Sequence, residues 1–252
     1  MWVQVPPRPP SNFFMSKEKL SYKEFEWNEK IAYVIGLLTT DGNLSKDGRH
    51  IVFKSSDLQL VRVFKKCLNL SNKIAKTKKS GWEKKPHYRI QFGNVQFYKW
   101  LLRIGLCPRK TKKLKEIKIP NKYFKDFLRG HLDGDGSICS YRDYWNAFKN
   151  PKYIYERLWI RFLSTSKNHV LWLHRKIKQF LNVKGHIWER KPRRNDQTTS
   201  VWELKFGKKD SLKILKWIYY KKDLPCLERK RKIAERFLTK IIREGSNPSP
   251  GT

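Results

Sequence analysis

The 252-residue chain is strongly basic, with 57 Lys and Arg residues against 22 Asp and Glu residues and a formal net charge of +35. Apolar residues make up 39% of the sequence, which is enough for a globular core and excludes global disorder. A charge this large repels itself in a compact fold, so it favours a polyanionic partner: nucleic acid first, an anionic membrane surface second. The sequence has neither a transmembrane-length apolar run nor a signal peptide, so we expect an intracellular, unsecreted protein without a membrane partner.

The periodicity of apolar residues predicts a regular order of elements. Residues 1–16 carry four prolines and no periodicity, which is typical of an extended arm, and Leu20–Trp27 fits a short lead-in helix within the same N-terminal extension. After it we expect a helix, a strand pair, a second helix, a second strand pair and a third helix, with the main segments at 29–40, 50–54, 57–68, 74–92 and 94–104. The predicted order is αββαββα.

Matching residues at similar offsets indicate that this unit is duplicated. Asp41 and Asp135 lie 94 positions apart, and Phe53 and Phe162 lie 109 apart. The jump between these offsets predicts an insertion around Tyr141–Tyr155. We therefore expect an α+β fold of two pseudo-symmetric repeats that form a saddle of antiparallel sheets around two packed helices. The expected divisions are an extension (1–28), repeat 1 (29–107), a linker (108–122), repeat 2 (123–242) and a tail (243–252).

The first helix of each repeat ends in the dipeptide Asp-Gly. Small residues four apart on each helix predict a close seam between the two, formed by Gly36, Thr40, Gly130 and Gly134. Gly42 and Gly136 suit the left-handed residue that follows many helices. Asp41 and Asp135 oppose the helix dipole by about 0.3–1 kcal/mol each. Two such anions beside a seam predict a metal site, and oxygen ligands favour Mg²⁺, with Mn²⁺ able to substitute.

The strands carry basic side chains on the face opposite their apolar side. Such a face fits double-stranded DNA, with some side chains at base edges and others at phosphates. The residues expected to contact DNA are Lys54, His87, Arg89, Gln91, Arg157, Arg161, Arg190, Arg193, Arg194 and Lys205.

The paired motifs, Val34–Gly42 and Leu128–Gly136, resemble the LAGLIDADG homing endonucleases in their single-chain, two-repeat form, over residues 29–240. The resemblance implies that Asp41 and Asp135 are metal ligands, assisted by the backbone carbonyls of Thr40 and Gly134. It also implies catalytic lysines after the last helix of each repeat, which are Lys110 and Lys230, with Lys112 and Lys232 as rivals in the same runs. Asp57 and Ser166 match positions that order catalytic water. Thr39 occupies the slot that holds Asp133 in the second motif, so we expect an asymmetric site.

The function implied is that of an intron-encoded, Mg²⁺-dependent endodeoxyribonuclease acting as a monomer on a long, nearly asymmetric duplex site. Such an enzyme would hydrolyse one phosphodiester on each strand across the minor groove and leave 3′ overhangs, which would promote intron homing. We would expect it to work beside the genome that hosts the intron, in the cytoplasm of a prokaryote or in an organelle.

Two alternatives share the fold. An RNA-splicing maturase would bind its own intron RNA and cut DNA little or not at all, but RNA binding alone does not require the two aspartates. A LAGLIDADG-derived transcription regulator commonly adds a helix-turn-helix domain, for which we see no segment. The sequence lacks a nucleophile start and a His-Asn ending, so we expect a free-standing protein and not an intein.

Overall fold

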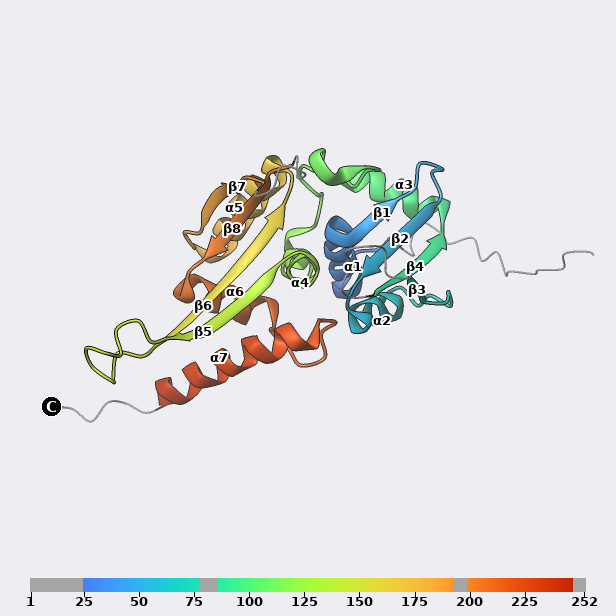
Figure 1. Cartoon of the computed structure of the whole chain (residues 1–252). Coiled ribbons are helices and arrows are strands. Elements are labelled where there is room, and N and C mark those ends of the chain that lie inside the picture. The colour runs from blue at the N-terminus through green and yellow to red at the C-terminus, as the bar shows by residue number, and fades with distance from the viewer. Residues whose placement is uncertain (1–24, 78–85, 193–198, 247–252) are drawn as a thin grey trace, which may run out of the picture.

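Two four-stranded antiparallel sheets lie on either side of a central pair of helices in the computed structural model (Figure 1). The structure describes residues 25–77, 86–192 and 199–246. Within these residues, no helix combines the length and apolar character needed to cross a bilayer.

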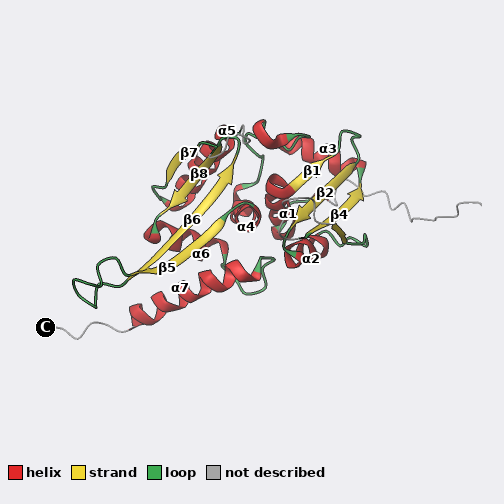
Figure 2. Ribbon diagram, viewed as in Figure 1, coloured by secondary structure: helices red, strands yellow, loops and turns green. Residues whose placement is uncertain are grey.

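Both repeats follow the predicted αββαββα order (Figure 2). Repeat 1 contains α1 (Glu29–Asp41), β1 (Gly42–Leu44), β2 (His50–Ser55), α2 (Leu58–Cys67), β3 (Ala75–Thr77), β4 (His87–Gly93) and α3 (Val95–Ile104). Repeat 2 contains α4 (Phe124–Gly134), β5 (Ser137–Asp143), β6 (Tyr155–Ser164), α5 (Lys167–Leu181), β7 (His186–Arg190), β8 (Val201–Phe206) and α6 (Lys208–Ile218). The strand orders, β1-β2-β4-β3 and β5-β6-β8-β7, are equivalent. The α+β fold class and the duplication are therefore confirmed.

Local signals explain where the helices begin. The side chain of Asn28 accepts a hydrogen bond from Ile31 N at 2.9 Å, and Asn94 caps α3 through Phe97 N at 2.8 Å. Asp57 caps α2 through Gln59 N, and Ser166 caps α5 through His169 N. Each cap satisfies a backbone donor that the first helical turn leaves unpaired.

One face of each sheet forms the core. In repeat 1, Ile51, Phe53 and Ile90 are fully buried under α2, and the rings of Phe53 and Phe64 stack 4.5 Å apart. In repeat 2, the residues of β6 and β8 that are equally buried are Ile160, Phe162, Leu204 and Phe206. The period-2 alternation predicted for these strands is thus the alternation between core and outer surface.

The seam between α1 and α4 is as close as the small residues predicted. A Cβ on Gly36 would lie 2.2 Å from the carbonyl oxygen of Phe127, and a Cβ on Gly134 would lie 1.9 Å from Thr40 Oγ1. No side chain fits at these separations, so the two backbones meet only because the positions are glycine.

The expectation of a left-handed conformation at Gly42 and Gly136 was wrong. Gly42 has φ −81° and ψ 151°, which is extended backbone, and Gly136 is not among the described residues with positive φ. Both glycines are instead required by crowding, because an added Cβ would lie 2.6 Å from Leu38 Cα at the first and 2.7 Å from Leu132 Cα at the second. The chain passes from α1 straight into β1, and from α4 through Asp135 and Gly136 into β5.

Repeat 2 has two features that repeat 1 lacks. Residues 144–154 connect β5 and β6, where residues 45–49 connect β1 and β2, so the expected insertion is present. A long helix, α7 (Glu228–Ser246), follows α6 and packs along β5 (Figure 1). The αββαββα pattern does not contain it, and sequence reasoning did not single it out.

Candidate active site

Asp41 and Asp135 come together where the seam ends. Asp41 is the last residue of α1, and Asp135 follows the last residue of α4. A Cβ on Gly134 would lie 3.1 Å from Asp41 Oδ2, which places that carboxylate beside the opposite motif. The helix seam therefore positions both acids.

The surroundings of these two acids disfavour their negative charge. Burial raises the pKa of Asp41 to about 7, and the negative charge of Asp135 adds to the effect. Burial also raises the pKa of Asp135, while Lys110 and Lys230 oppose the shift. Asp135 is nonetheless an exposed residue, so its carboxylate reaches solvent. Such a pair can stay ionised at neutral pH when a cation shares the charge.

One lysine from each run reaches the end of a motif helix. Lys110 Nζ donates to the carbonyl of Thr40 at 2.9 Å and to that of Gly42. Lys230 Nζ donates to the carbonyls of Leu132, Asp133 and Gly136 at 2.5, 2.9 and 2.7 Å. These bonds occupy helix-terminal carbonyls that have no partner within the helix.

The rival lysines lie elsewhere: Lys112 and Lys232 are exposed, whereas Lys230 is only 3% exposed. Burial lowers the pKa of Lys230 to about 8 and also lowers the pKa of Lys110. Of the two candidates in each run, Lys110 and Lys230 are the ones that face the paired acids. Their catalytic role stays a prediction.

The donor set fits a hard divalent cation. It offers two carboxylates and the carbonyls of Thr40 and Gly134, and the Thr40 carbonyl also accepts from Lys110. Among the described residues no three His, Cys, Asp or Glu side chains cluster as metal ligands. Two carboxylates completed by waters and carbonyl oxygens are an arrangement that hard divalent cations accept.

The two motifs differ beside the acids. Asp133 is buried and accepts from Tyr33 OH at 2.8 Å and from Leu227 N at 2.7 Å, so it anchors the segment that leads into α7. Its counterpart Thr39 donates to Ile35 O within α1 at 2.7 Å. The two motifs therefore differ at this position, because Asp133 bonds to two other segments and Thr39 bonds within its own helix.

Sequence reasoning missed the buried clamp around Arg129. Its guanidinium forms an ion pair with Asp126 at 2.8 Å and donates to the carbonyls of Pro225 and Ile218, both at 2.9 Å. The clamp ties α4 to the segment before α7, which carries Lys230. Only the unusual Arg within an apolar motif could have indicated it.

A cleft of about 310 Å³ opens beside Asp41, with His87 and Arg229 among its lining residues. Asp57 lines it too, and its second carboxylate oxygen pairs with Arg229 at 3.1 Å. Ser166 does not lie in this cleft: it is buried, caps α5 and donates to Leu114 O. The two positions expected to order water thus differ in their surroundings, since Asp57 lines the cleft and Ser166 is buried at the start of α5.

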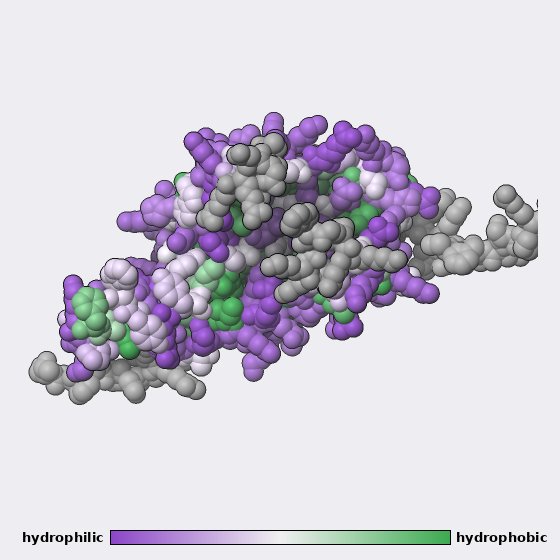
Figure 3. Space-filling model, viewed as in Figure 1, coloured by the Kyte–Doolittle hydropathy of each residue, from purple (hydrophilic) through white to green (hydrophobic). Residues whose placement is uncertain are grey.

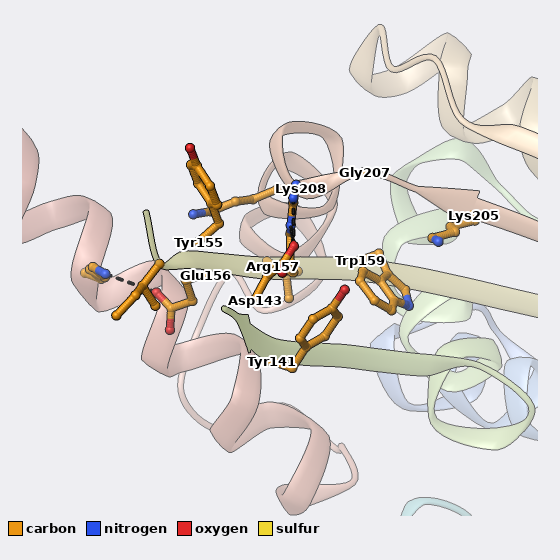
Figure 4. A pocket seen from close by; sticks show the side chains of 12 residues that line it. Tyr141, Asp143, Tyr155, Glu156, Arg157, Trp159, Lys205, Gly207 and Lys208 are labelled. Carbon is orange, nitrogen blue, oxygen red and sulfur yellow. Dashed lines mark hydrogen bonds and ion pairs between the residues drawn. The ribbon is translucent and has the colours of Figure 1, made fainter. Parts of the chain in front are cut away.

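The expected DNA-contacting residues that the structure describes lie on the outer faces of the sheets. Lys54 and Arg89 are directly opposite in the β2–β4 ladder, on the face away from Phe53. In repeat 2, Arg161 and Arg190 contact the buried Glu203 at 3.7 and 3.2 Å, so Glu203 orients both cations. Lys205 Nζ lies 4.4 Å from the ring centre of Trp159 (Figure 4). The same outer faces carry His87, Gln91 and Arg157, while Arg193 and Arg194 lie outside the described residues.

Known proteins share the sequence motif and the fold. Residues 28–113 match the family model of the LAGLIDADG-like domain. The DNA-bound I-LtrWI LAGLIDADG homing endonuclease is 13% identical, with 87% of this chain and 91% of that chain covered and a TM-score of 0.52. I-DmoI in complex with DNA and Ca is 16% identical, with 82% and 97% covered and a TM-score of 0.51.

The same fold occurs in another protein. The N-terminal LAGLIDADG domain of DUF199/WhiA is 19% identical, with 81% of this chain and 88% of that chain covered and a TM-score of 0.50. The chain spans 62% of full-length DUF199/WhiA from Thermatoga maritima. No curated protein sequence matches the chain. Residues 28–113 thus form a LAGLIDADG-like domain, and the described chain as a whole has the two-repeat LAGLIDADG fold.

Proposed function

We propose that the protein is a site-specific, Mg²⁺-dependent DNA endonuclease that cuts both strands of a long duplex site as a monomer. The observation that carries the proposal is the pairing of Asp41 and Asp135 at the end of the seam, each motif backed by an inward-facing lysine. Two anions at the C-terminal ends of neighbouring helices oppose the helix dipoles and repel each other, so they do not stabilise the fold by themselves. The arrangement is useful when those anions hold a cation.

Each residue then has a defined task. Bound Mg²⁺ supplies positive charge at the scissile phosphates and a more acidic water, as divalent ions do in phosphodiester hydrolysis. Asp41 and Asp135 hold it, one facing each DNA strand, and Lys110 and Lys230 place positive charge where the phosphates gain negative charge. The outer sheet faces hold the duplex through cations at phosphates and base edges.

The two acids sit one on each repeat, so each acid would act on one strand of the duplex. Cutting across the minor groove would leave 3′ overhangs, and an intron that encodes such an enzyme spreads by this break. The relatives bound to DNA, one of them with Ca, support this assignment by analogy of fold.

Because the fold also occurs in a WhiA domain, fold alone does not specify a nuclease. An RNA-splicing maturase on the same fold would use the basic faces without the acids. The pairing of Asp41 and Asp135 at the end of the seam favours cleavage, because binding nucleic acid alone does not require these acids.

The direct test is a cleavage assay with Mg²⁺ on duplex DNA that carries the intron-free allele of the host gene. A duplex enriched from a randomised pool by the purified protein serves where that allele is not known. We expect double-strand cleavage that depends on Mg²⁺ and stops with a chelator. Tight duplex binding without cleavage at any Mg²⁺ or Mn²⁺ concentration would contradict the proposal.

A further inference from the structure

The connection between β5 and β6 exposes more aromatic surface than a solvated turn needs. Trp145 is 82% exposed, Phe148 79% and Tyr144 54%. Figure 3 shows pale and green residues gathered at this projecting tip, on a face that is otherwise mostly purple. The equivalent connection in repeat 1, residues 45–49, contains no aromatic residue. The rings are thus a feature of one repeat only.

Hydrogen bonds hold the connection in a defined shape. Trp145 N donates to Asp143 Oδ1 at 3.0 Å, and Ala147 N donates to Tyr144 O at 2.9 Å. The turns continue through Lys149 N to Asn146 O at 3.1 Å. The aromatic side chains therefore project from a backbone that is already ordered.

Helix α7 braces the stem of this hairpin from the inner side. Arg236 donates to Ser140 Oγ at 2.8 Å, and Lys240 pairs with Glu156 at 3.0 Å. The residues next to these in sequence, Tyr141 and Tyr155, point to the outer side and are about half exposed. With this support from α7, the projecting hairpin can keep its position when it contacts a ligand.

The outer side of the stem continues the proposed DNA face. Tyr141 and Trp159 meet edge to face at 5.3 Å, and Arg157 beside them pairs with Asp143 at 2.8 Å (Figure 4). A hollow of about 690 Å³ runs along these residues to Lys205. A duplex lying on Arg161 and Lys205 would therefore pass over the hairpin as it leaves repeat 2.

The charge and chemistry of the tip decide what it contacts. The two acids of the hairpin, Asp143 and Glu156, are paired with cations, and Lys149 and Lys152 add positive charge at the tip. Cations suit phosphates, but the rings of Trp145 and Phe148 gain little there. Apolar side chains contact DNA where they enter between base pairs and partly unstack them, which kinks the duplex.

We propose that residues 144–154 form an aromatic wedge that inserts between base pairs of the DNA flanking repeat 2 and kinks the duplex at that end only. This inference rests on the proposed function, because the wedge extends the same DNA face. It also predicts a site with two unequal ends, since repeat 1 has no counterpart.

The test uses the full chain and a duplex enriched from a randomised pool, with 2-aminopurine placed at successive flanking positions. We expect fluorescence to rise at one step beyond repeat 2 and at none beyond repeat 1. The double variant Trp145→Ala/Phe148→Ala should lose the signal and bind about tenfold more weakly, within the range for losing stacked rings. The matched control, Leu102→Ala/Leu171→Ala, removes two exposed apolar side chains from helices and should change neither signal nor affinity.

Three results would overturn the inference. If the double variant binds with unchanged affinity and no flanking 2-aminopurine position gains fluorescence in the wild type, the aromatic wedge is excluded. The nuclease proposal is not affected by that result. Preferential capture of single-stranded RNA through the same two rings assigns the tip to another ligand. Failure of the protein to enrich any duplex overturns both this inference and the proposed function.

Discussion

The carbonyl oxygen of Tyr33 lies 2.1 Å from the position that a Cβ on Gly130 would occupy. Because the atom in the way belongs to the backbone of α1, it cannot move aside as a side chain could. We expect Gly130→Leu to lower the free energy of unfolding by about 3 kcal/mol, through overpacking of the seam. Urea unfolding followed by circular dichroism measures the loss.

Gly207→Ala is the matched control for the seam variant. Nothing lies within 4 Å of a Cβ at Gly207, and its φ of −71° suits alanine. Gly207 is the N-cap of α6, where alanine is less favourable than glycine, but alanine also lowers the entropy of the unfolded chain. We therefore expect the unfolding curve of Gly207→Ala to match the wild type within about 1 kcal/mol. A Gly130→Leu curve that also matches would mean that α1 and α4 are not in tight contact.

The paired acids provide the second prediction. Replacing Asp41 or Asp135 by Asn keeps the side-chain shape and removes the charge that would hold the metal. We expect either variant to lose at least about 1,000-fold in double-strand cleavage rate, since a metal supplies several kcal/mol of transition-state stabilisation. Duplex affinity in Ca²⁺ should stay close to wild type. Asp223→Asn, which changes an exposed acid, is the control, and normal cutting by either active-site variant would exclude these residues from the mechanism.

The lysine runs provide a third prediction, because the structure separates neighbours that the sequence leaves equivalent. Lys110 donates to the carbonyls of Thr40 and Gly42, whereas Lys112 is exposed. We expect Lys110→Met to slow cleavage of saturated DNA by about 100-fold while it weakens binding much less. Lys112→Met should leave the cleavage rate unchanged. Equal losses of rate and affinity in Lys110→Met would make it a phosphate contact alone.

The outer face of the first sheet provides a fourth prediction. Arg89 is exposed on β4 opposite Lys54, and Lys99 is exposed on α3. If Arg89 neutralises a phosphate, Arg89→Ala should weaken binding and reduce the slope of log K against log salt by about 1. Lys99→Ala makes the same charge change on the helical side and should leave the slope as it is. Identical slopes for the two variants would place the duplex elsewhere.

Much of the fold follows from local patterns. The repeated motif spacing was sufficient to predict the element order, and the alternation in β2 and β4 was sufficient to predict the sheet faces. A strand that is buried on one side alternates apolar and polar residues along its sequence. Gly36 and Gly130 predicted the seam for the same kind of reason, since only close backbones require small residues four apart.

The remaining features depend on contacts between segments that are distant in sequence. Which lysine of the first run faces inward depends on the turn of the linker at Arg109, which has φ 53°, and no sequence periodicity predicts that turn. Arg129 gains its role from carbonyls at Ile218 and Pro225, far along the chain. Gly42 shows a different limit: a helix-ending glycine can be required by crowding as well as by a left-handed turn, and the sequence alone does not distinguish the two.

A buried histidine pair provides the last prediction. His131 and His169 stack with their ring centres 5.2 Å apart and their Nε2 atoms at 3.1 Å, and His169 Nδ1 bonds to Lys115 O at 2.7 Å. Burial lowers the pKa of His169 to about 4, and it lowers the pKa of His131 well below its usual value, with the positive charges of Lys230 and Lys110 acting in the same direction. Both rings are therefore neutral in the fold at neutral pH.

The sign of the pH effect follows from these depressed pKa values. An unfolded histidine takes up its proton near pH 6.5, but the folded pair resists it, so stability is complete above that pH and falls as the pH drops towards 4. His169 alone contributes a loss of about 3 kcal/mol across this window. We expect His131→Leu/His169→Leu to lose that share of the pH dependence, measured by urea unfolding at successive pH values. His186→Leu, at an exposed site, should keep the wild-type dependence. Parallel stability curves for the wild type and the double variant would mean that the pair is already protonated or open to solvent in the fold.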